Sequence, residues 1–302
     1  MTSSIASFAD WMKQVQSTME EALGASLPSD ATVPARLHEA MRYAVLNGGK
    51  RVRPLLVFAA GDLFDADAAS LQRAAAALEM IHAYSLVHDD MPCMDDDALR
   101  RGKPTVHVKY DEATALLVGD ALQSQAFVVL SEGVAEGEGQ ATRRLAMLRL
   151  LAQASGSAGM CGGQAIDLAS IGLALSLGEL EHMHQLKTGA LLRASVLLGA
   201  LAGKTLSDAE IAALDAYSVA IGLAFQVVDD VLDATADSAT LGKTAGKDAA
   251  DNKPTYVSIL GLAESKALAD KLRDDAHRAL MPFGEKARRL REIADLIVQR
   301  KA

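Results

Sequence analysis

The sequence predicts an all-α protein, and three observations lead to that prediction. None of the seven prolines lies between Pro104 and Pro254, although this stretch covers half of the 302 residues. The same stretch is rich in Ala, Leu, Glu and Lys, which favour helices, whereas proline is excluded from helix interiors. Alternating runs of β-branched residues, which would indicate strands, are missing. Together these features predict one helix after another.

We expect ten or more helices, separated by glycines, prolines and polar segments. The expected ranges are 5–23, 33–47, 53–64, 67–90, 111–132, 137–156, 177–201, 207–234, 254–280 and 284–299. The start near 207 has a physical cause, because Ser207 and Glu210 have the spacing of a capping box. The most polar breaks, at 91–110 and 235–253, each follow directly on an acidic cluster.

Length and composition favour one domain, residues 1–302. The chain would allow one large domain or two ordinary ones, but it has no long Gly/Ser-rich or Pro-rich linker. Hydrophobic residues make up 50% and charged residues 23%, which excludes a disordered chain. Aromatic residues make up only 4%, so the core must be aliphatic.

The net charge of −9 argues against a nucleic-acid partner, because a phosphate backbone requires a basic surface. No uninterrupted apolar run has the length of a membrane span, and no targeting segment stands out at the N-terminus. Cys93 and Cys161 match no zinc or redox spacing, so we expect buried or idle thiols in a reducing cytoplasm.

Two acidic clusters close apolar helices. The first has five carboxylates within nine residues: Asp89, Asp90, Asp95, Asp96 and Asp97. Pro92 should end the helix there and allow the chain to fold Asp95 back toward Asp89. In the second cluster, Asp229, Asp230 and Asp233, the first and last members are spaced i, i+4 and share a helix face. Carboxylates this close repel one another, so a divalent cation such as Mg²⁺ is the natural partner.

Basic residues lie close to both clusters in sequence. They are Lys50, Arg51 and Arg53 beside two glycines, Arg100, Arg101 and Lys103 after the first cluster, and Lys243, Lys247 and Lys253 after the second. Arginine and lysine bind phosphate groups. Acids that hold magnesium beside such cations indicate a diphosphate or triphosphate substrate.

Two other patterns are rejected. Gly242-Lys-Thr is typical of the end of a phosphate-binding loop, but Asp237 stands where the first glycine would be and no strand precedes it. The pairs Glu79-x-x-His82 and Glu179-x-x-His182 are typical of di-iron carboxylate bundles. That reading needs two further inward glutamates, and His182 lies in a polar run.

The ordered set of motifs resembles the trans-isoprenyl diphosphate synthases, most closely the bacterial farnesyl diphosphate synthases. The resemblance covers nearly the whole chain. Its matching pieces are GGKRVRP at 48–54, the segment 81–107, GMCGGQAIDL at 159–168, KTGALL at 187–192, FQVVDDVLD at 225–233, GKTAGKD at 242–248 and KPTY at 253–256. It implies an isoprenoid-synthase-type helical bundle around a central cavity, usually in a homodimer.

The resemblance also implies roles, residue by residue. Asp89, Asp95 and Asp229 would bind three Mg²⁺ ions, for which Mn²⁺ could substitute, supported by Asp90 and Asp233; Asp230 counts among the catalytic residues. The allylic diphosphate, of dimethylallyl or geranyl diphosphate, would be held by Arg100, Lys187 and Lys243, with Lys253 nearby. Isopentenyl diphosphate would be held by Lys50, Arg53, His82 and Arg101, and the carbocation would be stabilised by Gln226 and the backbone at Lys187 and Thr188, where Gly189 would allow a helix break.

The implied product is farnesyl diphosphate. Tyr84 lies five residues before Asp89, about 7.5 Å along a helix, where its ring would stop the growing tail. A geranylgeranyl or geranyl diphosphate synthase of the same family is the alternative. A terpene cyclase would share the fold but lack the isopentenyl site of Lys50, Arg53 and Arg101. An inert partner subunit would not need both acidic clusters intact.

Overall fold

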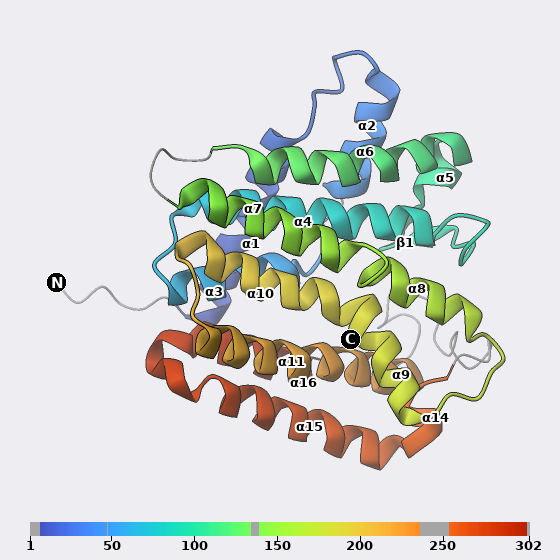
Figure 1. Ribbon diagram of the computed structural model, residues 1–302. Helices are drawn as coiled ribbons and strands as arrows, with labels where there is room; N and C mark the ends of the chain where they lie inside the picture. The colour runs from blue at the N-terminus through green and yellow to red at the C-terminus, as the bar shows by residue number, and fades with distance from the viewer. Residues whose placement is uncertain (1–6, 47, 134–138, 236–253, 301–302) are drawn as a thin grey trace. The chain divides into compact units, whose positions relative to one another are not determined.

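The computed structural model describes residues 7–46, 48–133, 139–235 and 254–300, and it confirms the all-α prediction (Figure 1). The helices are α1 (Phe8–Ser26), α2 (Ala35–Val45), α3 (Val52–Leu63), α4 (Ala68–Asp89), α5 (Val106–Lys109), α6 (Glu112–Ser131), α7 (Gln140–Ser155), α8 (Met160–Ala169), α9 (Leu177–His184), α10 (Ala190–Gly203), α11 (Asp208–Thr235), α14 (Tyr256–Leu260), α15 (Leu262–Ala279) and α16 (Arg288–Gln299). A π-helix, η1 (Gln185–Gly189), joins α9 to α10, and a 3₁₀ segment, η2 (Met281–Ala287), precedes α16.

Contacts divide the chain into two compact units. The first unit comprises residues 1–148 and 198–204, and the second comprises 149–197 and 205–302. The boundary passes through α7 and α10. The first acidic cluster lies in the first unit and the second cluster in the second unit. The single domain over 1–302 and the central cavity therefore stay predictions.

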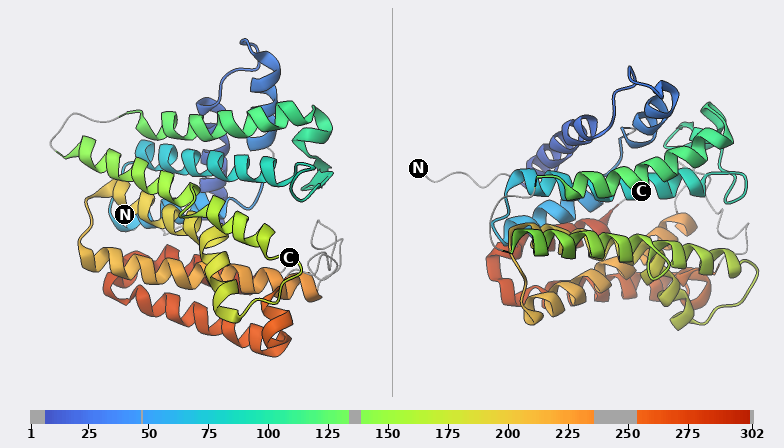
Figure 2. Two further views of the ribbon diagram at one scale, coloured as in Figure 1. Left: turned by 45° about the vertical axis from the view of Figure 1, so that its right-hand side comes forward. Right: turned by 45° about the horizontal axis from the view of Figure 1, so that its top comes forward.

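In the first unit, α4 packs along α6, and Figure 2 shows the two helices side by side in both views. Small residues make this close packing possible. Gly119 of α6 lies against His88 of α4, where a Cβ atom would come within 1.9 Å of the imidazole Nε2. His88 also bonds through Nε2 to the carbonyl oxygen of Leu116, at 3.1 Å. These contacts fix the end of α4 that carries the first acidic cluster.

In the second unit, α11 packs along α15, and a buried tyrosine ties it to α16. Tyr217 is fully buried, and its hydroxyl donates a hydrogen bond of 2.7 Å to the carbonyl oxygen of Leu290. The start of α11 confirms the capping box, because the amide of Ser207 donates to Glu210 Oε2 at 2.8 Å and the amide of Glu210 donates to Ser207 Oγ at 3.3 Å.

Several elements differ from the expected ones. The helices α5 and α8 were not predicted, and the expected helix 254–280 is split at Gly261, whose φ of +85° is outside the helical region. Residues 284–287 belong to the 3₁₀ segment instead of the last helix. A short hairpin, β1 (Leu99–Arg100) and β2 (Lys103–Pro104), follows the first acidic cluster. Cys93 and Cys161 are both exposed, so the buried alternative was wrong.

Three helical stretches are long and apolar enough to cross a membrane by length and composition alone: 112–131, 177–203 and 208–235. The sequence expectation counted only uninterrupted apolar runs, and these stretches are interrupted by charged residues. Between 39% and 61% of their most apolar windows is buried within the protein. Helices that are apolar on most sides also form the interior of large proteins, so these properties do not place them in a membrane.

Candidate active site

The first acidic cluster folds back on the end of its helix, as predicted. Beyond the last turn of α4, the backbone amide of Asp95 donates a hydrogen bond of 2.9 Å to the carbonyl oxygen of Asp89. The amide of Asp97 likewise donates to the carbonyl oxygen of Asp90, at 3.2 Å. Asp96 occupies the left-handed region with φ of +50°, which allows the sharp reversal. The backbone therefore brings Asp89 and Asp95, two proposed metal ligands, into one turn.

Asp90 is buried and holds Arg100. Its carboxylate accepts hydrogen bonds from Arg100 Nε at 2.8 and 2.9 Å and from Nη2 at 2.5 Å, and only 3% of the residue is exposed. Burial raises the pKa of the Asp90 carboxyl, and the hydrogen bonds and charge of Arg100 oppose that rise. Asp90 thus supports the cluster by orienting an arginine.

In the β1–β2 hairpin, Arg100 ends strand β1 and Arg101 begins the turn that follows. Its turn is formed by Arg101 and Gly102, whose φ angles of +53° and +75° are those of a type I′ turn. Arg101 donates a hydrogen bond through Nη1 to the carbonyl oxygen of Gly48. Gly49, with φ of +130°, leaves room for the guanidinium, since a Cβ atom there would lie 2.6 Å from Nη1. The hairpin therefore connects the basic motif that contains Arg101 with the basic motif that follows Gly48 and Gly49. Both belong to the proposed isopentenyl diphosphate site.

A buried ion pair supports this basic region. Arg51 Nη1 lies 2.6 Å from Glu79 Oε2, and both side chains are 4% exposed. Arg51 also bonds to Glu20 Oε1 at 2.6 Å and to the carbonyl oxygen of Val45 at 2.9 Å. Because the Glu79 carboxylate pairs with Arg51, it does not serve as an iron ligand, which supports the rejection of the di-iron pattern. Lys50 beside it is exposed.

His82 lies close to this cationic group. Burial, together with the positive charges of Arg53 and Arg101, holds the pKa of His82 well below its usual range, so the imidazole is neutral at pH 7. A small pocket of about 40 Å³ in the first unit is lined by residues that include Ala83, Asp90, Arg100, Arg101 and Thr105, but not by His82. Arg53 and Arg101 therefore lie close enough to His82 to lower its pKa, and their role in binding isopentenyl diphosphate stays a prediction.

Tyr84 is buried on α4. It is 5% exposed, and its ring meets the ring of His88 edge to face, with centroids 5.8 Å apart. This contact holds the tyrosine ring on the side of α4 where His88 packs against α6. Tyr84 lies about one and a half turns of helix before Asp89, and its role as a stop for the product tail stays a prediction.

In the second unit, Asp230 is the buried member of its cluster. It is 4% exposed, and its Oδ1 accepts a hydrogen bond of 2.9 Å from Gln226 Nε2. Its Oδ2 accepts one of 2.8 Å from the backbone amide of Tyr256. Both Asp-Asp pairs thus show the same arrangement, in which the second aspartate is buried and orients a neighbour. Asp233, one turn further on, is also largely buried.

Asp229 is more open, with 42% of its side chain exposed, and it contacts the end of the chain. Arg300 Nη2 lies 2.7 Å from Asp229 Oδ1 and also donates to the carbonyl oxygen of Phe225, at 2.9 Å. The guanidinium carbon lies 4.1 Å from the centre of the Phe225 ring. The sequence analysis assigned no role to Arg300, so this contact was not predicted.

The helix that carries Lys187 and Thr188 does not break at Gly189. It continues as the π-helix η1, a local widening that is frequent at functional sites. Lys187 Nζ lies 2.5 Å from Asp167 Oδ2 of α8. The two helices can approach because Gly163 faces Lys187, where a Cβ atom would lie 2.1 Å from its backbone nitrogen. Asp167 was not predicted as a site residue, although it lies in the quoted motif at 159–168.

A stacked pair lies one turn before Lys187. The rings of His184 and Tyr256 are 5.7 Å apart and nearly parallel, and Tyr256 is fully buried. Burial lowers the pKa of His184 to about 4, although the charge of Asp167 opposes this. The neutral imidazole supports Tyr256, whose backbone amide bonds to Asp230. This pair therefore links the π-helix to the second acidic cluster.

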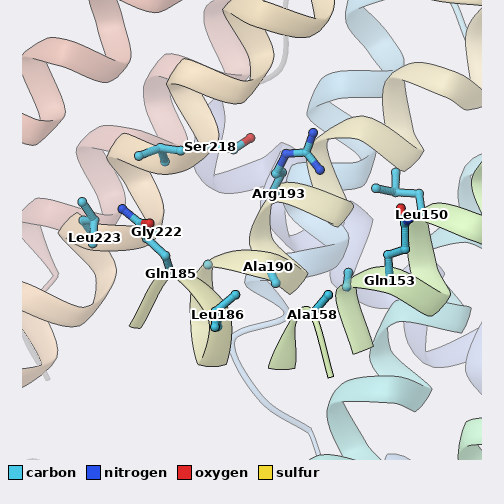
Figure 3. Close-up of a pocket in the computed structure, with 13 residues that line it drawn as sticks. Leu150, Gln153, Ala158, Gln185, Leu186, Ala190, Arg193, Ser218, Gly222 and Leu223 are labelled. Carbon is cyan, nitrogen blue, oxygen red and sulfur yellow. The ribbon is translucent and has the colours of Figure 1, made fainter. Parts of the chain in front are cut away.

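A pocket of about 370 Å³ lies in the second unit, on another face of the π-helix (Figure 3). Its lining comes from α7, η1, α10 and α11 and from the turn after α7, and includes Gln153, Gln185, Gly189, Arg193, Ser218 and Gly222. Neither Lys187 nor Thr188 lines it. The sequence did not predict this pocket.

The carboxylates on α11 fit a divalent cation by their chemistry. Asp229 and Asp233 supply oxygen donors one turn apart, which hard cations prefer. Across residues 7–46, 48–133, 139–235 and 254–300, no group of three or more His, Cys, Asp or Glu side chains is arranged to hold a metal. A cation here would take its other ligands from water and diphosphate oxygens. Lys243 and Lys253 lie outside the described residues.

Comparison with known proteins identifies the family. The polyprenyl synthetase model matches residues 34–283. The farnesyl diphosphate synthase of Escherichia coli is 46% identical, with 96% of this chain and 99% of that protein covered. The apo structure of an FPP/GFPP synthase from Zymomonas mobilis is 44% identical with a TM-score of 0.86, covering 96% of this chain and 98% of that one. A geranyltransferase of Helicobacter pylori, complexed with magnesium and isoprenyl diphosphate, is 32% identical with a TM-score of 0.83, and 98% of each chain is covered.

These matches cover nearly the whole chain and include both acidic clusters. The chain belongs to the polyprenyl synthetase family, and the resemblance drawn from its motifs is confirmed.

Proposed function

We propose that this protein is a farnesyl diphosphate synthase, a prenyltransferase that condenses isopentenyl diphosphate with dimethylallyl and then geranyl diphosphate. The observation that carries the proposal is the pair of Asp-Asp motifs at helix ends. In each, one aspartate is buried and orients a neighbouring side chain, while the first remains more open. The relative from Escherichia coli bears this activity in its name. A geranylgeranyl or geranyl diphosphate synthase is the alternative within the family.

The basic residues divide between two diphosphates. Lys50, Arg53, His82 and Arg101 would hold isopentenyl diphosphate: Arg101 bonds to the carbonyl oxygen of Gly48, and Arg53 and Arg101 both lower the pKa of His82. Arg100 and Lys187, each already oriented by a carboxylate, would hold the allylic diphosphate together with Lys243 and Lys253. The residues proposed to hold isopentenyl diphosphate also distinguish the protein from a terpene cyclase, which has no second diphosphate to bind.

Asp89, Asp95 and Asp229 would hold Mg²⁺, or Mn²⁺ in its place, with support from Asp90 and Asp233; three ions per site are proposed from the family resemblance. The bound metal would supply charge neutralisation for the departing diphosphate. Arg100 and Lys187 would add hydrogen bonds to the same oxygens. Gln226, Thr188 and the π-helix backbone would stabilise the carbocation, and apolar side chains would keep water away from it. The lost proton would pass to the departed diphosphate, so no side-chain base is needed.

We also propose a cytoplasmic homodimer. Leu116, Leu117 and Val128 of α6 are each about half exposed, which is unusual for large apolar residues on one helix. A second copy of the chain would cover this face. Sedimentation velocity would measure the mass in solution, and a monomer at micromolar concentration would contradict the proposal.

The function is tested by incubating the protein with isopentenyl and dimethylallyl diphosphates and magnesium, and separating the products by chain length. We expect farnesyl diphosphate as the main product and no turnover after chelation of the metal. Release of geranyl or geranylgeranyl diphosphate instead would select the alternative within the family.

Replacing Tyr84 by alanine should lengthen the product. The buried ring packs against His88 and cannot move aside, because close-packed interiors relax only partially. Its removal should release geranylgeranyl diphosphate or longer products, while the first condensation proceeds at nearly the normal rate. Tyr84→Phe keeps the ring and should still give farnesyl diphosphate. An active Tyr84→Ala enzyme that stops at farnesyl diphosphate would place the stop elsewhere.

Replacing Arg300 by glutamine should strengthen metal binding to the substrate-free protein. The guanidinium pairs with Asp229 and so competes with a cation for that carboxylate. We expect Mn²⁺ affinity, measured by electron paramagnetic resonance, to rise on the order of fivefold, the equivalent of ~1 kcal/mol for a partly exposed pair. Arg193→Gln, which breaks the pair with Asp215 elsewhere on α11, is the matched control and should change nothing. Equal affinities in both variants would show that Arg300 does not compete.

A further inference from the structure

Asp230 holds a side-chain amide and a backbone amide at the second acidic cluster. It is buried, and each of its two oxygens accepts a hydrogen bond from a neutral group: the Gln226 side-chain amide and the Tyr256 backbone amide. Its neighbour Asp229 is much more exposed and pairs with Arg300. The two adjacent carboxylates therefore differ in burial.

The hydrogen bond to Asp230 determines the orientation of the Gln226 carboxamide. An ionised carboxylate has only acceptor oxygens, whereas a carboxamide has one acceptor end and one donor end. Only the NH₂ group of Gln226 can therefore face Asp230, at the observed distance of 2.9 Å. The carbonyl oxygen Oε1 then lies at the other end of the amide and remains available as an acceptor.

We propose that Asp230 is a positioning residue, which holds the Gln226 carboxamide with its carbonyl oxygen presented to the allylic cation. The inference rests on the proposed function, in which Gln226 stabilises that cation. A carbonyl oxygen carries partial negative charge and lowers the energy of a nearby cation, whereas an NH₂ group would raise it. Orienting this dipole before the reaction is the electrostatic preorganisation on which such catalysis depends.

The Asp230 side chain is itself held in place from the other side. The backbone amide of Tyr256 binds Oδ2 at the first residue of α14, and the Tyr256 ring is buried and stacked on His184. A backbone amide cannot reverse its polarity, so it always requires an acceptor at this position. This fixed donor makes the outcome of an amide substitution at residue 230 predictable.

Asp230→Asn should therefore reverse the Gln226 amide without changing the size of either side chain. The Asn oxygen should stay on the Tyr256 amide, which turns its NH₂ group toward Gln226. Gln226 must then offer its oxygen to Asn and present NH₂ to the cation. We expect kcat to fall on the order of 100-fold. The KM values of both substrates and the Mg²⁺ concentration for half-maximal rate should change less than about threefold.

Exchanging the two functional groups supplies the decisive variant. The double variant Gln226→Glu/Asp230→Asn keeps the total charge, and its Glu accepts from the Asn NH₂ group while presenting its second oxygen to the cation. We expect kcat to recover at least about tenfold relative to Asp230→Asn. Gln226→Glu alone places two carboxylates together, so its kcat should stay well below that of the wild type. A double variant no faster than Asp230→Asn would overturn the proposal.

Two further measurements separate the competing roles. If Asp230 were a metal ligand, Asp230→Asn would raise the Mg²⁺ requirement tenfold or more and keep kcat at saturating Mg²⁺, which would also overturn the proposal. In ¹⁵N-glutamine-labelled protein, the Gln226 NH₂ signals should be protected from hydrogen exchange and should lose that protection in Asp230→Asn. This test does not depend on turnover, so an inactive wild type would contradict the proposed function alone, whereas unprotected signals would contradict this inference.

Discussion

Asp229→Ala should lower turnover on the order of 100- to 1,000-fold while leaving helical content unchanged. Asp229 lies near the end of a 28-residue helix and is partly exposed, so its carboxylate contributes little to the packing of α11. Its loss removes an oxygen donor that Mg²⁺ would need beside the diphosphate. Asp89→Ala should have an effect of similar size, because Asp89 and Asp95 share one turn at the end of α4. Steady-state kinetics and circular dichroism are the two measurements.

Asp215→Ala is the matched control for Asp229→Ala. It removes an aspartate from the same helix, where it forms a partly exposed ion pair with Arg193. Such pairs contribute about 0–1 kcal/mol, so activity and melting temperature should remain close to wild type. A loss of helical content in Asp229→Ala or Asp89→Ala would assign the acidic clusters a structural role instead of a catalytic one.

Glu79→Ala should strongly destabilise the first unit. It would leave the guanidinium of Arg51 buried without its fully enclosed partner, and removing one member of a buried ion pair costs about 3–5 kcal/mol. Contacts of Arg51 with Glu20 and Val45 would remain, which favours the lower end of that range. Urea denaturation followed by circular dichroism would measure the change in the free energy of unfolding.

Glu20 offers a direct comparison, since it contacts the same arginine from a more exposed position. Its side chain is 42% exposed against 4% for Glu79, so Glu20→Ala should cost no more than about 1 kcal/mol. Equal losses in the two variants would mean that burial does not determine the contribution of these contacts.

Local patterns predicted much of the structure. Proline distribution and helix-forming composition predicted most of the helices to within a few residues, because these signals act within a single helix. Pro92 and the adjacent polar residues predicted the return of Asp95 to Asp89, which again involves one turn of chain. The capping box at Ser207 was confirmed for the same reason.

Contacts between distant segments could not be predicted in this way. The pairing of Arg300 with Asp229 joins residues 71 positions apart, and no local pattern specifies it. The π-helix depends on glycines of other helices: Gly163 faces Lys187, and Gly222 lies against Gly189. The β1–β2 hairpin has a turn of Arg and Gly, which is a weaker turn signal than Asn-Gly. The arrangement of the two units relative to each other stays a prediction, which rests on the family resemblance.

The contact between Gly163 and Lys187 has a consequence for building chimeric enzymes from relatives of this protein. Any side chain at 163 would collide with the backbone of the π-helix, so the two segments are sterically matched. A crossover point placed between residues 169 and 185 would combine an α8 from one parent with a π-helix from another. Parents that both carry glycine at this position should tolerate such a crossover, and parents that differ there should exchange residues 160–189 as one block.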